Sequence, residues 1–209
     1  MCGRYVVKNS VTKTSKLVKS AIQVEDNENY NAHPYQKLPV IKKYKNGNTL
    51  EALKWGLIPS WAKDKDFKVL INARLETIDE KVSFKKLIKN NRCVAVADGF
   101  YEWKREEKEK TPHYFFRQDK KTIFFAGIYE EDQFCLITEE AKDNITEIHH
   151  RQPVIINQTD VNRYLNLELQ GSTFLKDCKK PDLVFYEVSK DVNKPTNNSV
   201  SLIQENKYN

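Results

Sequence analysis

The chain has 209 residues, of which 39% are hydrophobic and 11% aromatic, enough for one sizeable domain with a packed core. Its 6 Gly and 7 Pro exclude collagen-like and low-complexity chains, and no run approaches the ~20 apolar residues that span a bilayer. With 35 Lys and Arg against 29 Asp and Glu, the formal net charge of +6 permits a polyanionic partner without requiring one.

The predicted strands are short, rich in β-branched and aromatic residues, and bounded by turn residues. In chain order, strands are expected over 4–7, 50–55, 93–97, 114–116, 122–129, 133–138, 154–156 and 183–188. The dipeptide Asp98-Gly99 marks a turn between two of them. The charged segment 104–110 (KREEKEK) is expected to form an exposed hairpin tip or loop.

Fewer helices are expected. Apolar residues at helical spacing predict helices over 12–22 and 81–90. Thr138 is a candidate cap for a helix that runs towards Ile148. Thr159 is a candidate cap for a helix over 160–170, with Gly171 as its stop.

Many short strands with scattered helices, without regular βαβ alternation, indicate an α+β protein. We expect a single domain over residues 2–203, built on a strongly bent, barrel-like antiparallel sheet with a few flanking helices. Residues 204–209 are expected to form a frayed C-terminal tail.

The four cysteines are Cys2, Cys93, Cys135 and Cys178. They form no C-x-x-C pair, and no His lies at metal-ligand spacing from them, so a zinc site is not expected. Free thiols and the lack of an export signal favour a cytoplasmic protein. The P-loop, dinucleotide-binding, zincin and α/β-hydrolase motifs are absent, and no metal or organic cofactor is expected.

The residue at position 2 has distinctive chemistry. Removal of the initiator Met1 would leave Cys2 with a free α-amine and a thiol on adjacent carbons. An α-amine has a pKa of ~7.7–8.0, so a useful fraction is neutral near pH 7. Such an aminothiol attacks an aldehyde with nitrogen and then closes on the imine carbon with sulfur, which yields a five-membered thiazolidine.

Five further segments occur in a characteristic order: MCGRY at 1–5, WGLIPSWA at 55–62, NARLET at 72–77, ADGFYEW at 97–103 and HHRQP at 149–153. Together they resemble the SOS-response-associated peptidase (SRAP) family, whose bacterial members process abasic sites in single-stranded DNA. The resemblance extends from residue 2 to about residue 200 and includes the segments 30–36 and 188–193. It implies one SRAP-like α+β domain with a basic groove for single-stranded DNA.

The resemblance also implies a covalent crosslink between Cys2 and the ring-opened aldehyde of an abasic site. Asn72 would hold the Cys2 amine, and Glu102 would carry protons at the amine and the sugar. His149 would be the general acid/base that helps to open the deoxyribose. From the residues alone, Asn72 is equally compatible with a turn, Glu102 with a solvent-facing strand position and His149 with a capped or core histidine.

Further residues are expected to contact DNA. By the resemblance, Arg74 and Arg151 would grip phosphates beside the lesion, with Arg4 as a helper. Trp61 and Trp103 offer faces for base stacking, worth ~1–3 kcal/mol per base.

Three positions depart from the family pattern. Leu75 stands where a small residue is usual, His150 replaces an Asp, and Gln152 replaces a Met. If the Asp of the family pattern orients the catalytic histidine, its replacement by His150 would alter catalysis or its pH dependence in this protein. The second histidine, His150, is also an alternative to His149 for part of the acid/base role.

Three functions remain open from the sequence. The first is an abasic-site processing enzyme that shields the lesion through the crosslink, with lyase or reversal chemistry as a side activity. The second is a peptidase that uses the N-terminal thiol, including self-removal of Met1. The third is a non-catalytic module that binds single-stranded DNA. We expect a monomer without membrane contact, because bound DNA needs an open groove.

Overall fold

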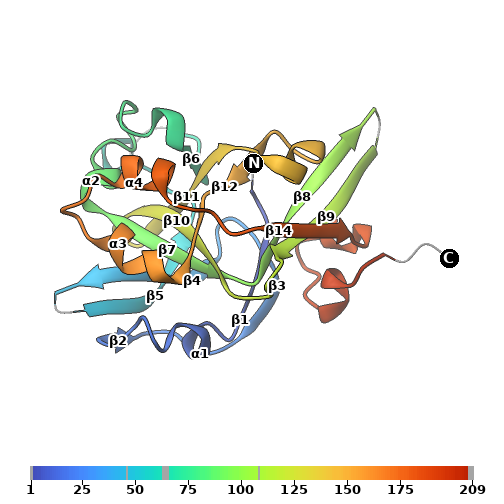
Figure 1. Ribbon diagram of the computed structural model, residues 1–209, viewed down its shortest axis with the longest axis horizontal. Helices are drawn as coiled ribbons and strands as arrows, with labels where there is room; N and C mark the ends of the chain where they lie inside the picture. The colour runs from blue at the N-terminus through green and yellow to red at the C-terminus, as the bar shows by residue number, and fades with distance from the viewer. Residues whose placement is uncertain (1, 46, 63–65, 108, 207–209) are drawn as a thin grey trace.

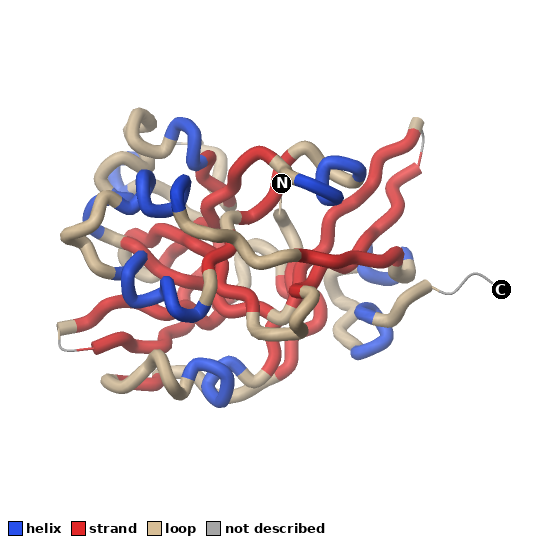
Figure 2. The backbone as a smooth tube through the Cα atoms, in the orientation of Figure 1, coloured by secondary structure: helices blue, strands red, loops and turns tan. Residues whose placement is uncertain are grey.

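The computed structural model describes residues 2–45, 47–62, 66–107 and 109–206. Within them the chain is an α+β protein with many strands and few, short helices, as expected (Figures 1 and 2). The strands form two sheets that pack face to face, and the longer helices cover the outer face of the larger sheet.

The smaller sheet has five strands in the described chain, in the order β14-β9-β8-β1-β3. Their bounds are β1 Tyr5–Lys8, β3 Glu28–Ala32, β8 Gly99–Glu106, β9 Glu109–Arg117 and β14 Leu183–Glu187. β8 and β9 form a hairpin that extends beyond the body of the molecule (Figure 1). The expectation of an exposed hairpin tip within 104–110 is therefore confirmed, although residue 108 lies outside the described residues.

The larger sheet has nine described strands, with β12-β11-β10-β7-β4-β5-β2 in one path and with β13 and β6 attached to β10 and β11. Their bounds are β2 Ala21–Ile22, β4 Lys37–Tyr44, β5 Gly47–Trp55, β6 Asn72–Arg74, β7 Arg92–Ala97, β10 Ile123–Glu130, β11 Gln133–Glu140, β12 Arg151–Pro153 and β13 Ile155–Ile156. β11 also pairs with β5, but only through Gln133 with Lys54 and Phe134 with Trp55. The larger sheet is therefore strongly bent and partly ring-like, as the sequence predicted, but it does not close into a barrel.

The helices in the described part of the chain are all short, and none is long and apolar enough to cross a membrane. The α-helices are α1 Ser10–Thr14, α2 Leu87–Asn90, α3 Val161–Leu165 and α4 Gly171–Asp177. The 3-10 helices are η1 Ser60–Ala62, η2 Leu75–Thr77, η3 Asp143–Glu147, η4 Gln158–Asp160, η5 Lys190–Asn193 and η6 Val200–Ile203.

Strand alternation assigns side chains to separate cores, because successive residues of a strand point to opposite faces. On β1, Tyr5 points between the two sheets, whereas Val6 points to the outer face of the smaller sheet. On β8, Phe100 points between the sheets and Tyr101 points outward. The segment that contains η5 and η6 covers this outer face through Val192 and Leu202.

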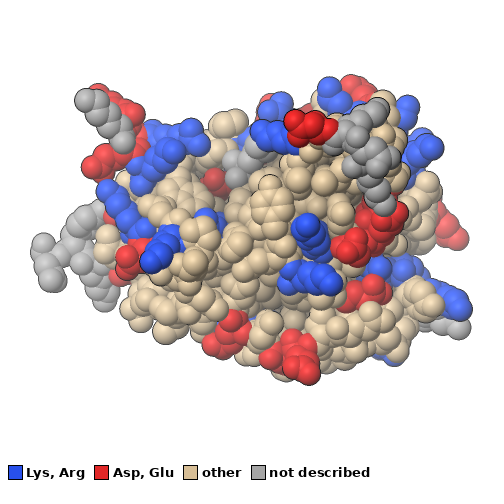
Figure 3. All heavy atoms as spheres, turned by 180° about the vertical axis from the view of Figure 1, so that it is seen from behind, with Lys and Arg blue, Asp and Glu red and all other residues tan. Residues whose placement is uncertain are grey.

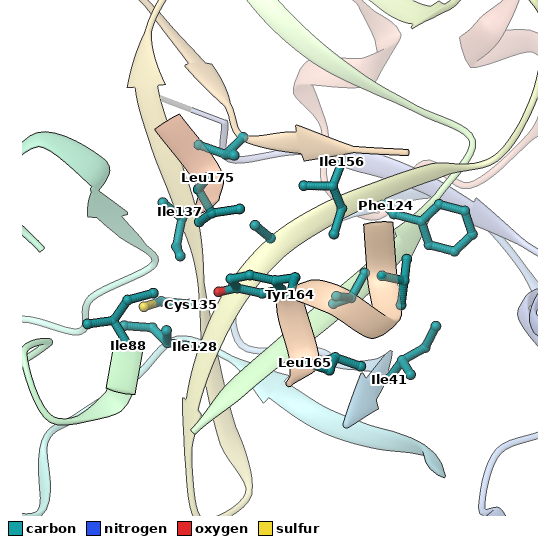
Figure 4. Packing of buried hydrophobic residues seen from close by; sticks show 14 of the residues in the cluster. Ile41, Ile88, Phe124, Ile128, Cys135, Ile137, Ile156, Tyr164, Leu165 and Leu175 are labelled. Atoms are coloured by element: carbon teal, nitrogen blue, oxygen red, sulfur yellow. The ribbon is translucent and has the colours of Figure 1, made fainter. Parts of the chain in front are cut away.

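A second core lies between the larger sheet and the helices α2, α3 and α4 (Figure 4). Tyr164 of α3 is fully buried there, and its hydroxyl donates to the carbonyl of Gly127 at 2.8 Å. Leu175 of α4 and Ile88 of α2 complete the helical side of this core. Short helices with little intrinsic stability are therefore held by tertiary packing.

Three helix predictions were wrong. The helix expected over 12–22 is limited to α1, and Ala21 and Ile22 pair with β5 instead. The helix expected from Thr138 does not form, because Thr138 is buried in β11 between partners on β6 and β12. Of the helix expected over 160–170 only α3 forms, and Gly171 begins α4 instead of ending a helix.

Gly171 is a glycine because of Arg92. A Cβ atom at position 171 would lie 2.6 Å from Arg92 Nε, so a side chain has no room. The buried Arg92 guanidinium donates to the carbonyls of Ile88, Tyr164, Asn166 and Leu169 at 2.5–3.0 Å. One side chain thus joins α2, α3 and the loop that precedes α4.

Of the tail expected over 204–209, Asn206 donates its backbone N–H to the carbonyl of Glu187 at 2.8 Å. Residues 207–209 lie outside the described residues.

Replacement of Arg92 by Met should lower the free energy of unfolding by about 3 kcal/mol, because several buried carbonyls lose their donor. Urea denaturation followed by circular dichroism measures the change. Arg163→Met is the matched control, since the Arg163 side chain is 64% exposed and contacts only the Asp160 carboxylate and the ring of Phe174 among the described residues. Equal stability of the two variants would show that the hydrogen bonds of Arg92 do not stabilise the fold.

Candidate active site

The candidate site lies where the edges of the two sheets meet, beside the start of the described chain (Figure 1). Cys2 precedes β1 and is fully buried against the core between the sheets. Asn72 of β6 donates from Nδ2 to the carbonyl oxygen of Cys2 at 2.9 Å. This bond connects the first residues of the smaller sheet to the larger one.

The Asn72 bond also fixes the orientation of its amide. A carbonyl oxygen only accepts, so the group that faces it must be the NH2, and Oδ1 must point elsewhere. Asn72 Oδ1 is buried and has no hydrogen-bond partner among the described residues. A buried acceptor without a donor costs about 1–3 kcal/mol. The site therefore presents an acceptor, next to Cys2, that is suited to a nitrogen donor.

Glu102 and His149 form the second half of the site. Glu102 lies on the same face of β8 as Phe100 and is only 3% exposed, so it does not face solvent. His149 follows η3, and its Nε2 lies 4.0 Å from Glu102 Oε2. His149 Nδ1 lies 2.9 Å from the backbone nitrogen and 3.0 Å from the carbonyl oxygen of Arg151, so it can accept from the N–H or donate to the carbonyl. A ring that donates from Nδ1 leaves Nε2, which faces Glu102, able to accept a proton.

Burial shifts the pKa of each of these groups towards its neutral form. It raises the pKa of Glu102 to about 7 and lowers the pKa of His149 to about 4. Burial, together with the nearby Glu102 carboxylate, raises the pKa of the Cys2 thiol well above its ordinary value. At neutral pH the site therefore holds a thiol, a neutral imidazole and a carboxyl group near its midpoint, which suits proton transfer in either direction.

An open cleft leads to this pair. A cleft of about 360 Å³ is lined by Glu102, Trp103, Arg105, Lys110, His149 and Asn193. It shares Trp103, Arg105 and His149 with a neighbouring hollow of about 570 Å³ that is also lined by Arg74 and His150. The ring of His150 stacks on that of His149 with centroids 4.4 Å apart.

The residues expected to contact DNA differ in their surroundings. Arg74 is exposed and lines the neighbouring hollow. Trp61 is 48% exposed, packs edge-on against Phe67 and lines neither the cleft nor the hollow. Arg4 Nη1 donates to Asn31 Oδ1 and to the carbonyl of Val192, both at 2.7 Å.

Arg151 is not open to solvent. It is 6% exposed, and its Nη1 and Nη2 bind the Glu76 carboxylate at 2.8 and 2.9 Å. Its Nη2 also donates to the carbonyl of Thr138 at 2.8 Å. A phosphate contact by Arg151 stays a prediction, and in this structure the side chain anchors the strand that carries the hydrogen-bond partner of His149.

Sequence reasoning missed three residues that line the cleft: Arg105, Lys110 and Asn193. Arg105 and Lys110 fell in the segment read as a charged loop, and Asn193 ended a segment that carried no assigned role. The register of the hairpin, which places Arg105 opposite Lys110, is the signal that identifies the first two.

The described residues contain no group of three or more His, Cys, Asp and Glu side chains that could hold a metal ion.

Figure 3 shows the face opposite to that of Figure 1, on which basic and acidic side chains surround a broad uncharged area.

The chain was compared with known proteins. A family model described as SOS response associated peptidase (SRAP) matches residues 1–195. The abasic site processing protein YoqW of Bacillus subtilis is 34% identical, over 98% of this chain and 99% of the relative. The abasic site processing protein YedK of Escherichia coli is 30% identical, over 82% of each chain.

The fold also has a counterpart among solved structures. A crystal structure of a protein from Bacteroides thetaiotaomicron superposes with a TM-score of 0.82 and covers 98% of this chain and 99% of that one, at 24% identity. At this identity the likeness establishes the fold alone.

The raised pKa of Glu102 predicts a pH-dependent stability. Because its folded pKa of about 7 exceeds the ordinary 4.5, the folded state binds more protons in this window, and stability falls as pH rises. The lowered pKa of His149 has the opposite effect up to pH 6.5 and masks part of this fall. Relative to the unaltered protein, Glu102→Gln should therefore gain on the order of 3 kcal/mol between pH 4.5 and 7.

Urea denaturation at several pH values measures this difference. The exposed Glu25→Gln serves as the control and should give a difference that does not change with pH. A flat difference for Glu102→Gln as well would show that the carboxyl group titrates at an ordinary value.

Proposed function

This chain belongs to the SOS response associated peptidase (SRAP) family, and from that premise we propose that it processes abasic sites in single-stranded DNA by a covalent crosslink through Cys2. The names of its relatives support the reaction class. The observation that carries the proposal is the grouping of Cys2 and Asn72 beside the Glu102–His149 pair, at the end of an open cleft.

The reaction requires a free α-amine on Cys2, and hence removal of Met1, which lies outside the described residues. The amine adds to the aldehyde of the ring-opened sugar, and loss of one water gives an imine. The thiol sulfur then adds to the imine carbon, and its proton ends on nitrogen. The product is a thiazolidine, and the whole sequence releases one water.

The electrostatics favour attack by nitrogen before sulfur. A buried thiol with a raised pKa stays protonated and is a poor nucleophile, whereas Asn72 Oδ1 is an acceptor suited to hold the amine. Glu102, near its midpoint at neutral pH, takes a proton from the ammonium and returns one to the departing hydroxyl. His149, neutral at this pH, accepts the proton from the sugar hydroxyl as the ring opens.

The same state of the thiol weighs against a peptidase that attacks through sulfur, because such enzymes need a thiolate. Lyase or reversal chemistry remains compatible, since the imine precedes ring closure and Glu102 and His149 carry protons in both directions. The exposed Arg74 supplies a phosphate contact in the neighbouring hollow, and Trp103 supplies a stacking face. We further propose that the protein acts as a cytoplasmic monomer.

Incubation with a labelled single-stranded oligonucleotide that carries one abasic site should give a slow band on a denaturing gel. The band should be absent with Cys2→Ala and unchanged with Cys178→Ser, the control for a half-buried thiol. Intact-mass measurement should show the protein without Met1, and the adduct should weigh one water less than its two parts. A band of equal strength from Cys2→Ala would overturn the mechanism.

Replacement of Glu102 by Gln should slow crosslinking by about 10²–10⁴-fold, the usual contribution of a positioned acid/base group. The rate with the unaltered protein should rise as pH rises through about 7, because the carboxylate is the form that accepts the ammonium proton. Single-turnover rates on the same gel measure both effects, with Glu25→Gln as the control. If the crosslinking rate of Glu102→Gln depended on pH as that of the unaltered protein does, Glu102 would have no role as a proton carrier in the reaction.

A further inference from the structure

Two cations of the β8–β9 hairpin lie directly opposite each other. Arg105 of β8 pairs with Lys110 of β9 in the antiparallel ladder, and both line the cleft that leads to Glu102 and His149. Like charges in opposite positions of a ladder repel and destabilise it. An anion between them would remove this repulsion.

Two glutamates of the hairpin, one beside each cation in the sequence, are engaged by other lysines. Glu106 forms an ion pair with Lys104 at 2.6 Å, and Glu109 forms one with Lys190 at 3.2 Å. Among the described residues, the side chains of Arg105 and Lys110 make no hydrogen bond or ion pair. The two glutamates next to Arg105 and Lys110 in the sequence are thus paired with other lysines, and within the cleft Arg105 interacts electrostatically with Glu102.

A third group in the cleft has a fixed orientation. Trp103 Nε1 donates to Asn193 Oδ1 at 2.7 Å. An indole N–H is only a donor, so it must face the amide oxygen and not the NH2. Asn193 is exposed and lines the cleft, which leaves its Nδ2 to donate to an acceptor there.

We propose that Arg105, Lys110 and Asn193 form a binding subsite for one phosphodiester group of the DNA strand, separate from the contact expected of Arg74. The arrangement offers two cations and an oriented amide donor, the chemistry that binds phosphate oxygens. Trp103 is a positioning residue for the Asn193 amide. The inference rests on the proposed function in that the bound anion belongs to the strand that carries the lesion.

The test is binding of abasic single-stranded oligonucleotides to the Cys2→Ser variant, which separates binding from crosslinking. Arg105→Gln and Lys110→Gln should each weaken binding by about tenfold. Each should also reduce the slope of log K against log salt by about 0.7, the value for one phosphate contact on a single strand. Lys85→Gln, an exposed lysine of the chain near α2, is the control of equal charge and should change neither.

Methylphosphonate substitution then locates the phosphate. Oligonucleotides with one neutral linkage at each position in turn should include one position at which the loss equals that of Arg105→Gln. At that position the two changes should not add, because they remove the same contact. Full additivity at every position would overturn the subsite.

Asn193 has its own variants. Asn193→Asp keeps an oxygen for Trp103 but replaces the donor with a negative charge, so it should bind more weakly than Asn193→Ala. Equal binding by both variants and the unaltered residue would remove Asn193 from the subsite. Trp103→Phe should weaken binding in the presence of Asn193 and have less effect in Asn193→Ala.

The two proposals fail differently. One outcome is that Arg105→Gln reduces the salt slope of binding while the protein with Cys2 intact forms no crosslink. That outcome would support the subsite and contradict the proposed function. A crosslink together with an unchanged salt slope in Arg105→Gln and Lys110→Gln would support the proposed function and overturn the subsite.

Discussion

The site depends on the alternation of side chains along β8. Because Phe100 and Glu102 are two residues apart, they share the face that packs against the larger sheet, and a carboxyl group is placed at the margin of an apolar core. Removal from water raises the pKa of that group to about 7. A one-residue slip in the β1–β8 register would turn Glu102 to the outer face, where its carboxyl group would meet water and have an ordinary pKa.

Burial has a second effect on the chemistry. The pKa of His149 is shifted in the opposite direction from that of Glu102, so between about pH 4 and 7 the carboxyl group holds its proton while the imidazole is neutral. The bidentate Arg151–Glu76 pair holds the strand whose backbone contacts Nδ1 of His149. His149 is thus positioned by an ion pair and by backbone contacts that lie outside the Glu102–His149 pair itself.

Much of the fold follows from local pattern, and the failures have a common cause. The strands over 93–97, 122–129 and 133–138 were expected, because their β-branched and aromatic residues fill two cores. Thr138 and Gly171 were misread because each has a local meaning, as a helix cap and a helix stop, that distant contacts override. The resemblance identified Cys2, Asn72, Glu102 and His149 by motif, and their geometry is compatible with the assigned roles. Arg105 and Asn193 were missed because only the hairpin register and the Trp103 bond bring them to the cleft.

Arg4 connects the two ends of the chain, since its guanidinium binds the carbonyl of Val192 and the side chain of Asn31. Asn31 in turn donates to the carbonyls of Lys194 and Asn197. A nascent polypeptide on the ribosome therefore lacks these bonds until residues 192–197 have been translated, whereas the strand partners of β1, which are β3 and β8, are made earlier. The segment that follows Cys2 therefore reaches its final set of contacts late in translation.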